Sequence, residues 1–324
     1  MKKGIAVAGS VLVDKIYQIA GYPQKGELTQ IKGISRAVGG LVPNVGIDLK
    51  KIDGSLTVYA CGKVGNDEEG EFVKSEFSRY GLDMSGLKTD AKEKTSFTDV
   101  MSEIGGERTF FTYAGASADF GESDMDFDKT DADMLHLGYF LLLDKIDNGD
   151  GLKILKKAKA KGVKTSIDLV SENSDRYSLV IPCLQYTDNL IINEIEAGSI
   201  AGIEPEKGNI RKIAEKLKEK GVKERVIIHL PQFGVCLSES GYTEIPSFDL
   251  PKGYIKGTTG AGDAFCAGSL YGIYKGYTDR EILEFGSMCA AVSLRVPDAV
   301  SGLTDEKGIR DFCKNLSRKF LEIR

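Results

Sequence analysis

Short apolar runs alternate with amphipathic segments along most of the chain. The runs are too short for typical helices and suit buried strands, whereas the segments between them repeat apolar residues at helical spacing. Alternation of this kind predicts an open, mostly parallel α/β sheet with helices on both faces. The expected strands are 5–9, 134–143, 163–169, 190–192 and 226–230, and the expected helices carry Val45, Leu49 and Ile52, then Leu152, Leu155 and Ala158, then Ile210, Ile213 and Leu217.

Two other stretches are rich in turn residues and alternate roughly with period two. They cover residues 12–34 and 94–114, and Gly105-Gly106 in the second predicts a β-hairpin. We expect them to form a small β-sheet that stands apart from the main sheet and serves as a lid that excludes water. We expect a single domain spanning residues 1–324, in which the first strand should run on through Ser10 and end at Asp14.

Composition narrows the class of partner. The chain has 324 residues, 41% hydrophobic content and a formal net charge of -5, which suits one large core and argues against nucleic acid or anionic membrane as a partner. No apolar stretch approaches the roughly 20 residues that a membrane span needs. The six cysteines include no Cys-x-x-Cys pair, which predicts buried thiols in a reducing cytoplasm.

Only His136 and His229 are present, and both lie in apolar runs. A histidine-rich metal site is therefore excluded, and core packing is the ordinary role for both rings. Proton transfer must fall mainly to carboxylates.

Gly260-Ala261-Gly262-Asp263 precedes an apolar run, so a helix should begin near Asp263. The free amides and dipole at such a terminus form a cradle for phosphate, and small residues let the anion approach. A carboxylate inside that cradle can take the proton of an attacking hydroxyl while the amides stabilise the transferred phosphoryl group. The same residues also suit an ordinary turn and helix cap.

Further polar candidates follow strands or glycines. Asp14 can accept two hydroxyl hydrogen bonds, Gly39-Gly40 allow close backbone approach, and Asn44 offers both a donor and an acceptor. Arg108 in the expected lid hairpin can reach an acceptor, although an exposed strand arginine is the commoner case. Ordinary solvated turns would also account for Asp14, Gly39-Gly40 and Asn44.

The ordered motifs resemble the ribokinase-like, or PfkB, family of carbohydrate kinases. They are Val7 to Asp14, Gly39-Gly40 with Asn44, Gly62-x-Val64-Gly65-x-Asp67-x-x-Gly70, Asn193-Glu194-x-Glu196, and Gly260-Ala261-Gly262-Asp263. The resemblance implies an ATP-dependent kinase with Asp263 as general base and Gly260, Ala261 and Gly262 as anion hole. It also implies that Asp14, Gly39, Gly40 and Asn44 meet the acceptor, and Arg108 stays a further acceptor candidate from its place in the lid alone.

On the nucleotide side, the resemblance gives Asn193 and Glu196 the task of organising Mg²⁺ through its waters. Carboxylate oxygens and retained water are what Mg²⁺ prefers. Without the family, the same pair would suit a solvated helix start. The remaining nucleotide-binding positions that the resemblance implies are Thr258, Gly234 and Ala290.

Three residues depart from the family pattern on that same side. Gly257 replaces a frequent acid that often supports a monovalent cation, so activation by potassium stays uncertain. Pro231 and Asp298 replace frequent glycines. An altered nucleotide preference or a site used only for binding would explain such changes.

The expected function is transfer of the γ-phosphate of ATP to a hydroxyl of a sugar or sugar-like molecule. The resemblance also implies a homodimer that pairs through the lid. Two alternatives stay open. A nucleoside kinase would use the same chemistry, with Tyr17, Tyr22, Phe97 or Phe111 stacking on a base. A sugar or nucleotide sensor without catalytic activity would keep only the fold.

Overall fold

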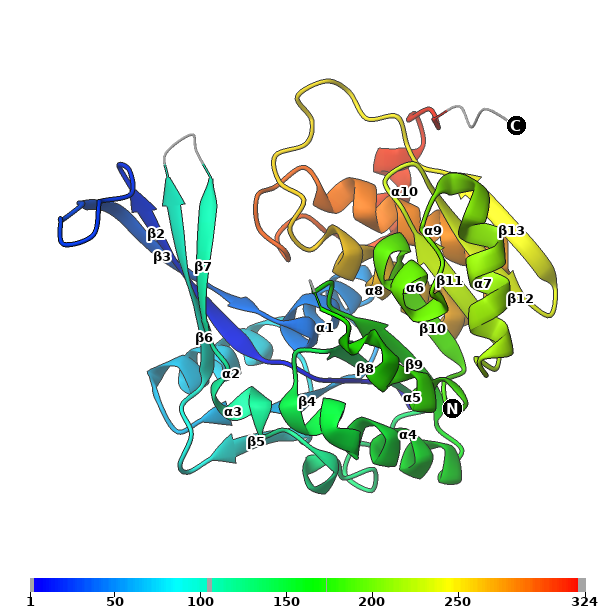
Figure 1. The fold of residues 1–324 in the computed structure, drawn as a ribbon, viewed down its shortest axis with the longest axis horizontal. Coiled ribbons are helices and arrows are strands. Elements are labelled where there is room, and N and C mark those ends of the chain that lie inside the picture. Colours follow the sequence, from blue (N-terminus) through cyan, green and yellow to red (C-terminus); the bar gives the residue numbers. More distant parts are fainter. Residues whose placement is uncertain (1–2, 104–106, 173, 320–324) are drawn as a thin grey trace.

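The computed structural model describes residues 3–103, 107–172 and 174–319 (Figure 1). Among these residues, nine strands form one large sheet in the order β13-β12-β11-β10-β9-β8-β1-β4-β5. Only the β11–β12 and β12–β13 pairs are antiparallel. The strands are β1 (Ile5–Ala8), β4 (Val58–Gly65), β5 (Leu87–Asp90), β8 (Met134–Phe140), β9 (Lys164–Leu169), β10 (Asn189–Asn193), β11 (Arg225–His229), β12 (Phe233–Ser238) and β13 (Gly241–Pro246).

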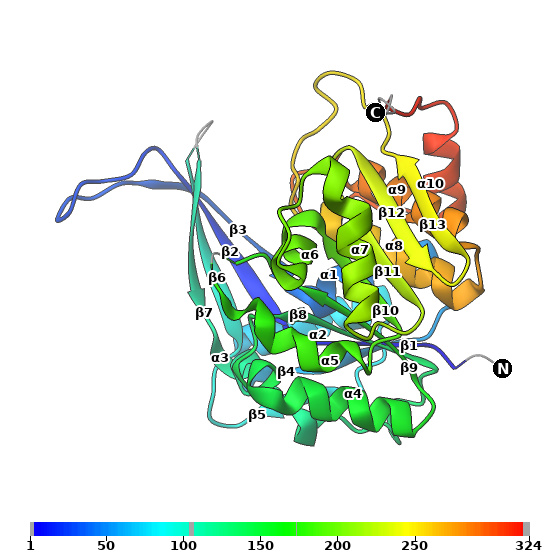
Figure 2. The same cartoon turned by 45° about the vertical axis from the view of Figure 1, so that its right-hand side comes forward.

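Helices cover both faces of this sheet, and Figure 2 shows one of the two helical layers in front of the strands. The first layer contains α1 (Leu41–Ile52), α2 (Glu68–Tyr80), α8 (Ala261–Lys275), α9 (Asp279–Ser293) and α10 (Glu306–Cys313). On the opposite face lie α4 (Gly151–Ala160), α5 (Ile181–Leu184), α6 (Glu194–Ala201) and α7 (Ile210–Glu219), and a short helix, α3 (Gly115–Ala118), follows the small sheet. The predicted fold class is confirmed.

Strand residues alternate between two hydrophobic cores because successive side chains point to opposite faces of a sheet. In β1, Ile5 and Val7 pack with the α1, α8 and α9 layer, whereas Ala6 and Ala8 pack with the α4 to α7 layer. Strands buried on both faces therefore have unbroken apolar sequences, and these apolar runs are the pattern that predicted the strands.

A separate four-stranded sheet has the order β3-β2-β6-β7 and extends from the main body (Figure 1). Its strands are β2 (Leu12–Ile19), β3 (Ile31–Gly39), β6 (Ser96–Glu103) and β7 (Arg108–Tyr113), so the first insertion continues to residue 39 and not to 34. The small sheet that the two β-rich stretches predicted is present. The Gly105-Gly106 turn lies outside the described residues.

One expectation about this region is wrong. We expected Ser10 to Asp14 to prolong the first strand, but β1 ends at Ala8 and Asp14 lies in β2 of the small sheet. Gly9 has φ of 147°, and a Cβ there would lie 2.7 Å from the Gly138 carbonyl oxygen. The chain therefore turns at a position that only glycine fits, and the turn carries Asp14 from one sheet to the other.

Within the described part of the chain, no helix combines the length and apolarity needed to cross a membrane. All six cysteines are buried and free.

Candidate active site

The N-terminus of α8 has the geometry that an anion cradle requires. Gly260 caps the helix at φ of 78°, in the left-handed region that glycine favours, and a Cβ there would lie 2.5 Å from Ala299 Cα. The Ala261 amide donates to the Thr258 carbonyl at 3.2 Å. Among the described residues, the amides of Gly262 and Asp263 have no acceptor, so these two donors are free for an anion.

Asp263 lies in the first turn of α8 and is 8% exposed. Asn44 Nδ2 donates to its Oδ2 at 2.9 Å, and the Tyr139 hydroxyl donates to both carboxylate oxygens at 3.0 Å. Burial raises the pKa of Asp263 to about 6, with the negative charge of Asp168 adding to the rise and the two donors opposing it. A carboxylate with that pKa is largely ionised at neutral pH and still accepts a proton readily.

Asn44 comes from the first turn of α1, directly after the glycine pair. Sequence reasoning assigned Asn44 to the acceptor, and in the structure its amide nitrogen donates to Asp263. Its amide oxygen is buried and has no partner among the described residues.

Tyr139 reaches Asp263 through an unusual backbone. Its φ is 58°, a strained region for a residue with a large side chain, and its amide donates to Asp168 Oδ1 at 2.7 Å. Gly138 must lack a side chain because a Cβ would lie 2.2 Å from the same Asp168 oxygen. The Gly138-Tyr139 pair and Asp168 thus hold a phenol against the candidate base.

Asp14, Gly39 and Gly40 meet where β2 and β3 pair. A Cβ on Gly39 would lie 2.5 Å from Asp14 Oδ2, and Gly40 has φ of 88° with its Cα facing Ser10. Burial raises the pKa of Asp14 to about 6. The structure therefore brings these three predicted residues together, immediately before the helix that carries Asn44.

Asn193 and Glu196 form a reciprocal capping box at the start of α6. Asn193 donates to Glu196 through its backbone amide at 3.1 Å and through Nδ2 at 2.8 Å, and the Ser171 hydroxyl donates to Glu196 Oε1 at 2.8 Å. Burial raises the pKa of Glu196 to about 7. The helix-start interpretation therefore holds, and the same arrangement points a polar cluster at the carboxyl ends of β9 and β10.

A cavity of about 490 Å³ lies next to the α8 terminus. Four residues of the predicted nucleotide side line it together, namely Asn193, Gly234, Thr258 and Ala290. A smaller cavity of about 220 Å³ adjoins Asp263 and is lined also by Asp168, Asn193, Glu196 and Tyr139. His229 and Gly262 border both cavities. The donors, the carboxylates and the two cavities thus form one continuous site.

Arg108 does not join this group. It is exposed at the first position of β7, at the free tip of the small sheet (Figure 1), and pairs with Ser102 across the hairpin. No hydrogen bond or ion pair connects its side chain to another described residue.

The three departures from the family pattern lie in different structural settings. Pro231 lines the large cavity. Gly257 packs so tightly that a Cβ would lie 2.8 Å from Pro297 Cα, so no acid fits there without a shift of that loop. Asp298 accepts from the amides of Val300 and Ser301 at 3.1 and 2.7 Å, which makes it a turn-stabilising residue.

Tyr139, Ser171 and Asp168 were not among the site residues predicted from the sequence. Tyr139 lies in an apolar run that reads as an ordinary strand, and nothing in that run signals a positive φ. Asp168, at the end of a predicted strand, carried the one usable signal, because polar residues at strand carboxyl ends face the ligand side of a parallel sheet.

A buried carboxylate beside free amides at a helix N-terminus has the donors and the proton acceptor that phosphoryl transfer requires. Comparison with known proteins agrees: the model of the pfkB family carbohydrate kinases matches residues 2–306. The chain belongs to this family and is an ATP-dependent carbohydrate kinase, which confirms the resemblance read from its motifs.

Individual relatives share this architecture. A ribokinase of Haemophilus influenzae is 24% identical over 97% of this chain and 100% of its own length, and fructokinase-1 of Zea mays is 24% identical over 92% and 94%. Among solved structures, Arabidopsis thaliana ribokinase complexed with ribose and ATP superposes with a TM-score of 0.84, at 23% identity and over 97% and 99% of the two chains. At 23% identity, the similarity to the Arabidopsis structure shows that the fold is shared.

Proposed function

We propose that this kinase transfers the γ-phosphoryl group of ATP to a hydroxyl of a sugar or sugar-like molecule, with Asp263 as the general base. One observation carries the proposal: a buried carboxylate with its pKa raised to about 6 stands beside the free amides of a helix N-terminus. A base and an oxyanion cradle at one point are what an attacking hydroxyl and a transferred phosphoryl group require.

In the proposed step, the acceptor oxygen bonds to the γ-phosphorus while the bond from that phosphorus to the β,γ-bridging oxygen breaks and releases ADP. The acceptor proton goes to Asp263. Asn44 and Tyr139 hold that carboxylate by hydrogen bonds at 2.9 and 3.0 Å, so the base is oriented before the acceptor arrives. The amides of Gly262 and Asp263 then stabilise charge on the transferred group.

We assign the nucleotide to the cavity of about 490 Å³ because the residues of the predicted nucleotide side line it. Ala290 and Ala291 leave room for a base on one wall, while Thr258 and Gly262 line the side toward the cradle. Glu196 and Asn193 would hold Mg²⁺ through its waters, because their oxygens suit a hard cation. When bound, that ion neutralises phosphate charge.

For the acceptor, we propose hydrogen bonding to Asp14 beside the backbone of Gly39 and Gly40. A carboxylate whose pKa burial raises to about 6 gains from hydroxyl donors that solvate its ionised form. The names of the relatives, ribokinase and fructokinase, support a sugar. Arg108 would contribute only if the tip of the small sheet moves toward the site.

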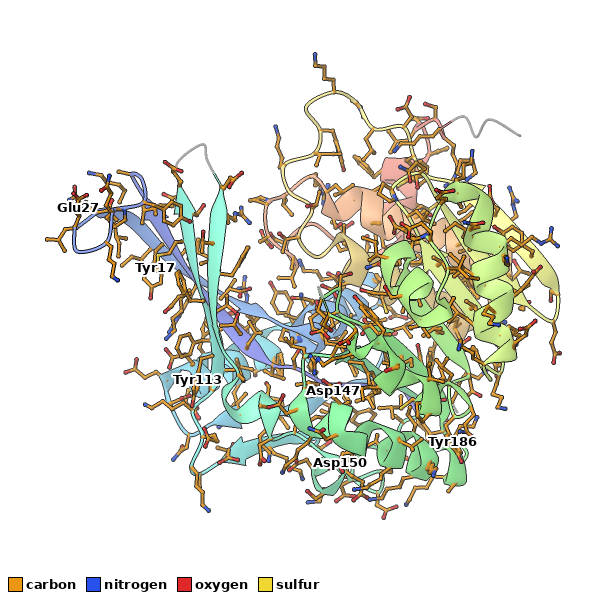
Figure 3. The ribbon with its side chains drawn as sticks, in the orientation of Figure 1. Tyr17, Glu27, Tyr113, Asp147, Asp150 and Tyr186 are labelled. Carbon is orange, nitrogen blue, oxygen red and sulfur yellow. The ribbon has the colours of Figure 1, made fainter. Side chains whose placement is uncertain are left out.

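A nucleoside acceptor has weaker support. Phe97 is already engaged by the Tyr113 ring at a centroid distance of 5.4 Å and by Lys15 Nζ at 4.4 Å. Tyr17 and Tyr113 lie on the small sheet, as labelled in Figure 3. Stacking on a base would therefore fall to Tyr17, Tyr22 or Phe111.

The test is ADP release from MgATP across a panel of free sugars, polyols, sugar acids, sugar phosphates and nucleosides. We expect turnover with one free sugar or sugar-like class. Turnover with nucleosides alone would replace the proposed acceptor, and a folded protein that binds MgATP without turning over any acceptor would favour the sensor.

The small sheet also supports the expected homodimer. Its described surface exposes the large apolar side chains of Ile34, Phe110 and Phe111 at 72%, 62% and 58%, and pairing of two such sheets would remove some of them from water. Light scattering should give twice the mass of one chain for the native protein and the mass of one chain for Phe110→Ser with Phe111→Ser.

A further inference from the structure

Three side chains from different elements converge just beneath the candidate base. They are His136 of β8, Asp168 of β9 and Cys266 of α8, with exposed fractions of 0%, 7% and 2%. His136 Nε2 lies 3.4 Å from Asp168 Oδ2 and 3.5 Å from Cys266 Sγ, and the three atoms all fall within 4.8 Å of one another. The kinase reaction described above uses none of the three as a reacting group.

These separations match the edges of a tetrahedral zinc site. With Zn–S of about 2.3 Å and Zn–N and Zn–O of about 2.0 to 2.2 Å, tetrahedral angles give an S···N edge of about 3.5 Å and an N···O edge of about 3.4 Å. Both edges that share His136 Nε2 therefore have the required length already. A thiolate, an imidazole and one carboxylate oxygen are a donor set that selects Zn²⁺ over Mg²⁺.

Neighbouring groups orient the candidate ligands. His136 Nδ1 lies 3.1 Å from Ser166 Oγ, so a proton on Nδ1 can be donated to that hydroxyl, which leaves the Nε2 lone pair facing the other two ligands. The second oxygen of Asp168 accepts from the Tyr139 amide at 2.7 Å, which fixes the carboxylate. Metal-binding histidines and carboxylates are commonly held by such partners.

The site has an open side. Cys266 and Asp168 line the cavity of about 220 Å³ that also contains Asp263 and Glu196. Among the described residues that line it, three are carboxylates and none is lysine or arginine. The cavity therefore gives a cation both access and a favourable field.

We propose that Cys266 Sγ, His136 Nε2 and Asp168 Oδ2 bind one soft divalent cation of the Zn²⁺ class, with the fourth position facing the cavity, and that the bound ion inhibits phosphoryl transfer. The Cys266 thiol releases its proton to solvent on binding. Asp263 and Cys266 are three residues apart on α8 and share one face of that helix. The added positive charge therefore acts beside the base and weakens its affinity for the acceptor proton.

Cobalt titration of the reduced full chain, without nucleotide, tests the site. Tetrahedral Co²⁺ bound to a thiolate absorbs in the near ultraviolet through charge transfer, and Zn²⁺ should displace it. We expect one Co²⁺ per chain with this absorption in the native protein and in Cys183→Ser, a buried cysteine of α5. Cys266→Ser should lose the absorption.

Ser166→Ala provides a second variant that keeps all three ligands. It should retain the absorption and bind about 10- to 100-fold more weakly, the usual effect of losing a residue that orients a ligand. Near-ultraviolet circular dichroism checks that each variant is folded. Absence of the thiolate absorption in the native protein, or its persistence in Cys266→Ser, would overturn the site, and so would binding at carboxylates alone.

A separate assay measures whether the bound ion inhibits phosphoryl transfer. Zn²⁺ should lower acceptor-dependent ADP release by the native chain and by Cys183→Ser, each relative to its own rate in chelator, and should leave the relative rate of Cys266→Ser unchanged. Stoichiometric binding without any loss of turnover would contradict inhibition and leave the site standing.

Discussion

Replacing Tyr139 by phenylalanine tests whether the phenol sets the basicity of Asp263. The hydroxyl donates to both carboxylate oxygens at 3.0 Å and so stabilises the ionised form. A hydrogen bond to a charged group contributes about 1.5 to 3 kcal/mol. One pKa unit corresponds to about 1.4 kcal/mol, so the loss should raise the pKa of Asp263 by about 1 to 2 units from its value of about 6.

The pH dependence of kcat/KM reads this shift directly. We expect the acidic limb of the profile, where activity rises as the base ionises, to move to higher pH by about 1 to 2 units in Tyr139→Phe. Activity near neutral pH should fall and recover on the alkaline side, because the Asn44 contact still orients the carboxylate.

Tyr271→Phe is the matched control. Tyr271 lies further along α8, is 3% exposed, and donates to Glu306 Oε2 at 2.7 Å, so it has the same chemistry away from the site. Its variant should keep the native profile. An unmoved acidic limb in folded Tyr139→Phe would refute the reasoning and assign that limb to another group, for which Glu196, with its pKa raised to about 7, is the first candidate.

Two further predictions concern stability. Burial raises the pKa of Glu196 from 4.5 to about 7, so its contribution to stability is present below pH 4.5 and is lost as pH rises through 7, by an amount on the order of 3 kcal/mol over the whole range. Urea unfolding at pH 6 and pH 8 without ligands should show a smaller decline in the free energy of unfolding for Glu196→Gln than for the native chain. Equal declines would contradict the shift. Gly138→Ala should lower the free energy of unfolding by about 1 to 3 kcal/mol because its Cβ would lie 2.2 Å from Asp168 Oδ1. By contrast, Gly208→Ala, where nothing lies within 4 Å, should stay within about 0.5 kcal/mol in the same measurement, and a similar cost at both glycines would contradict the steric argument.

Sequence periodicity was sufficient to predict the main sheet because its strands are buried on both faces and the helices between them are amphipathic. It failed at Ser10 to Asp14, where three apolar residues read equally well as more of the first strand. The turn at Gly9 depends on the approach of the Gly138 backbone, which is a tertiary contact. No local pattern reports a contact between residues so distant in sequence.

The site likewise combines residues that local sequence rules predict with residues whose roles depend on tertiary contacts. The helix terminus at Asp263 and the glycines beside Asp14 follow from local rules about φ and close approach, and these residues lie where the motifs indicated. Tyr139 gains its role from a strained backbone held by Asp168, and Asn44 gains its contact with Asp263 from the packing of α1 on α8. Both depend on the folded chain.

The central claim is that Asp263 takes the acceptor proton, and turnover of Asp263→Asn tests it most directly. With the acceptor that the panel identifies, kcat should fall by about 10²- to 10⁴-fold, while calorimetry shows MgATP still bound. Asp305→Asn, at the cap of α10, should keep native turnover because asparagine caps a helix equally well. Turnover within a few-fold of native in a folded Asp263→Asn would contradict the account and require a different base.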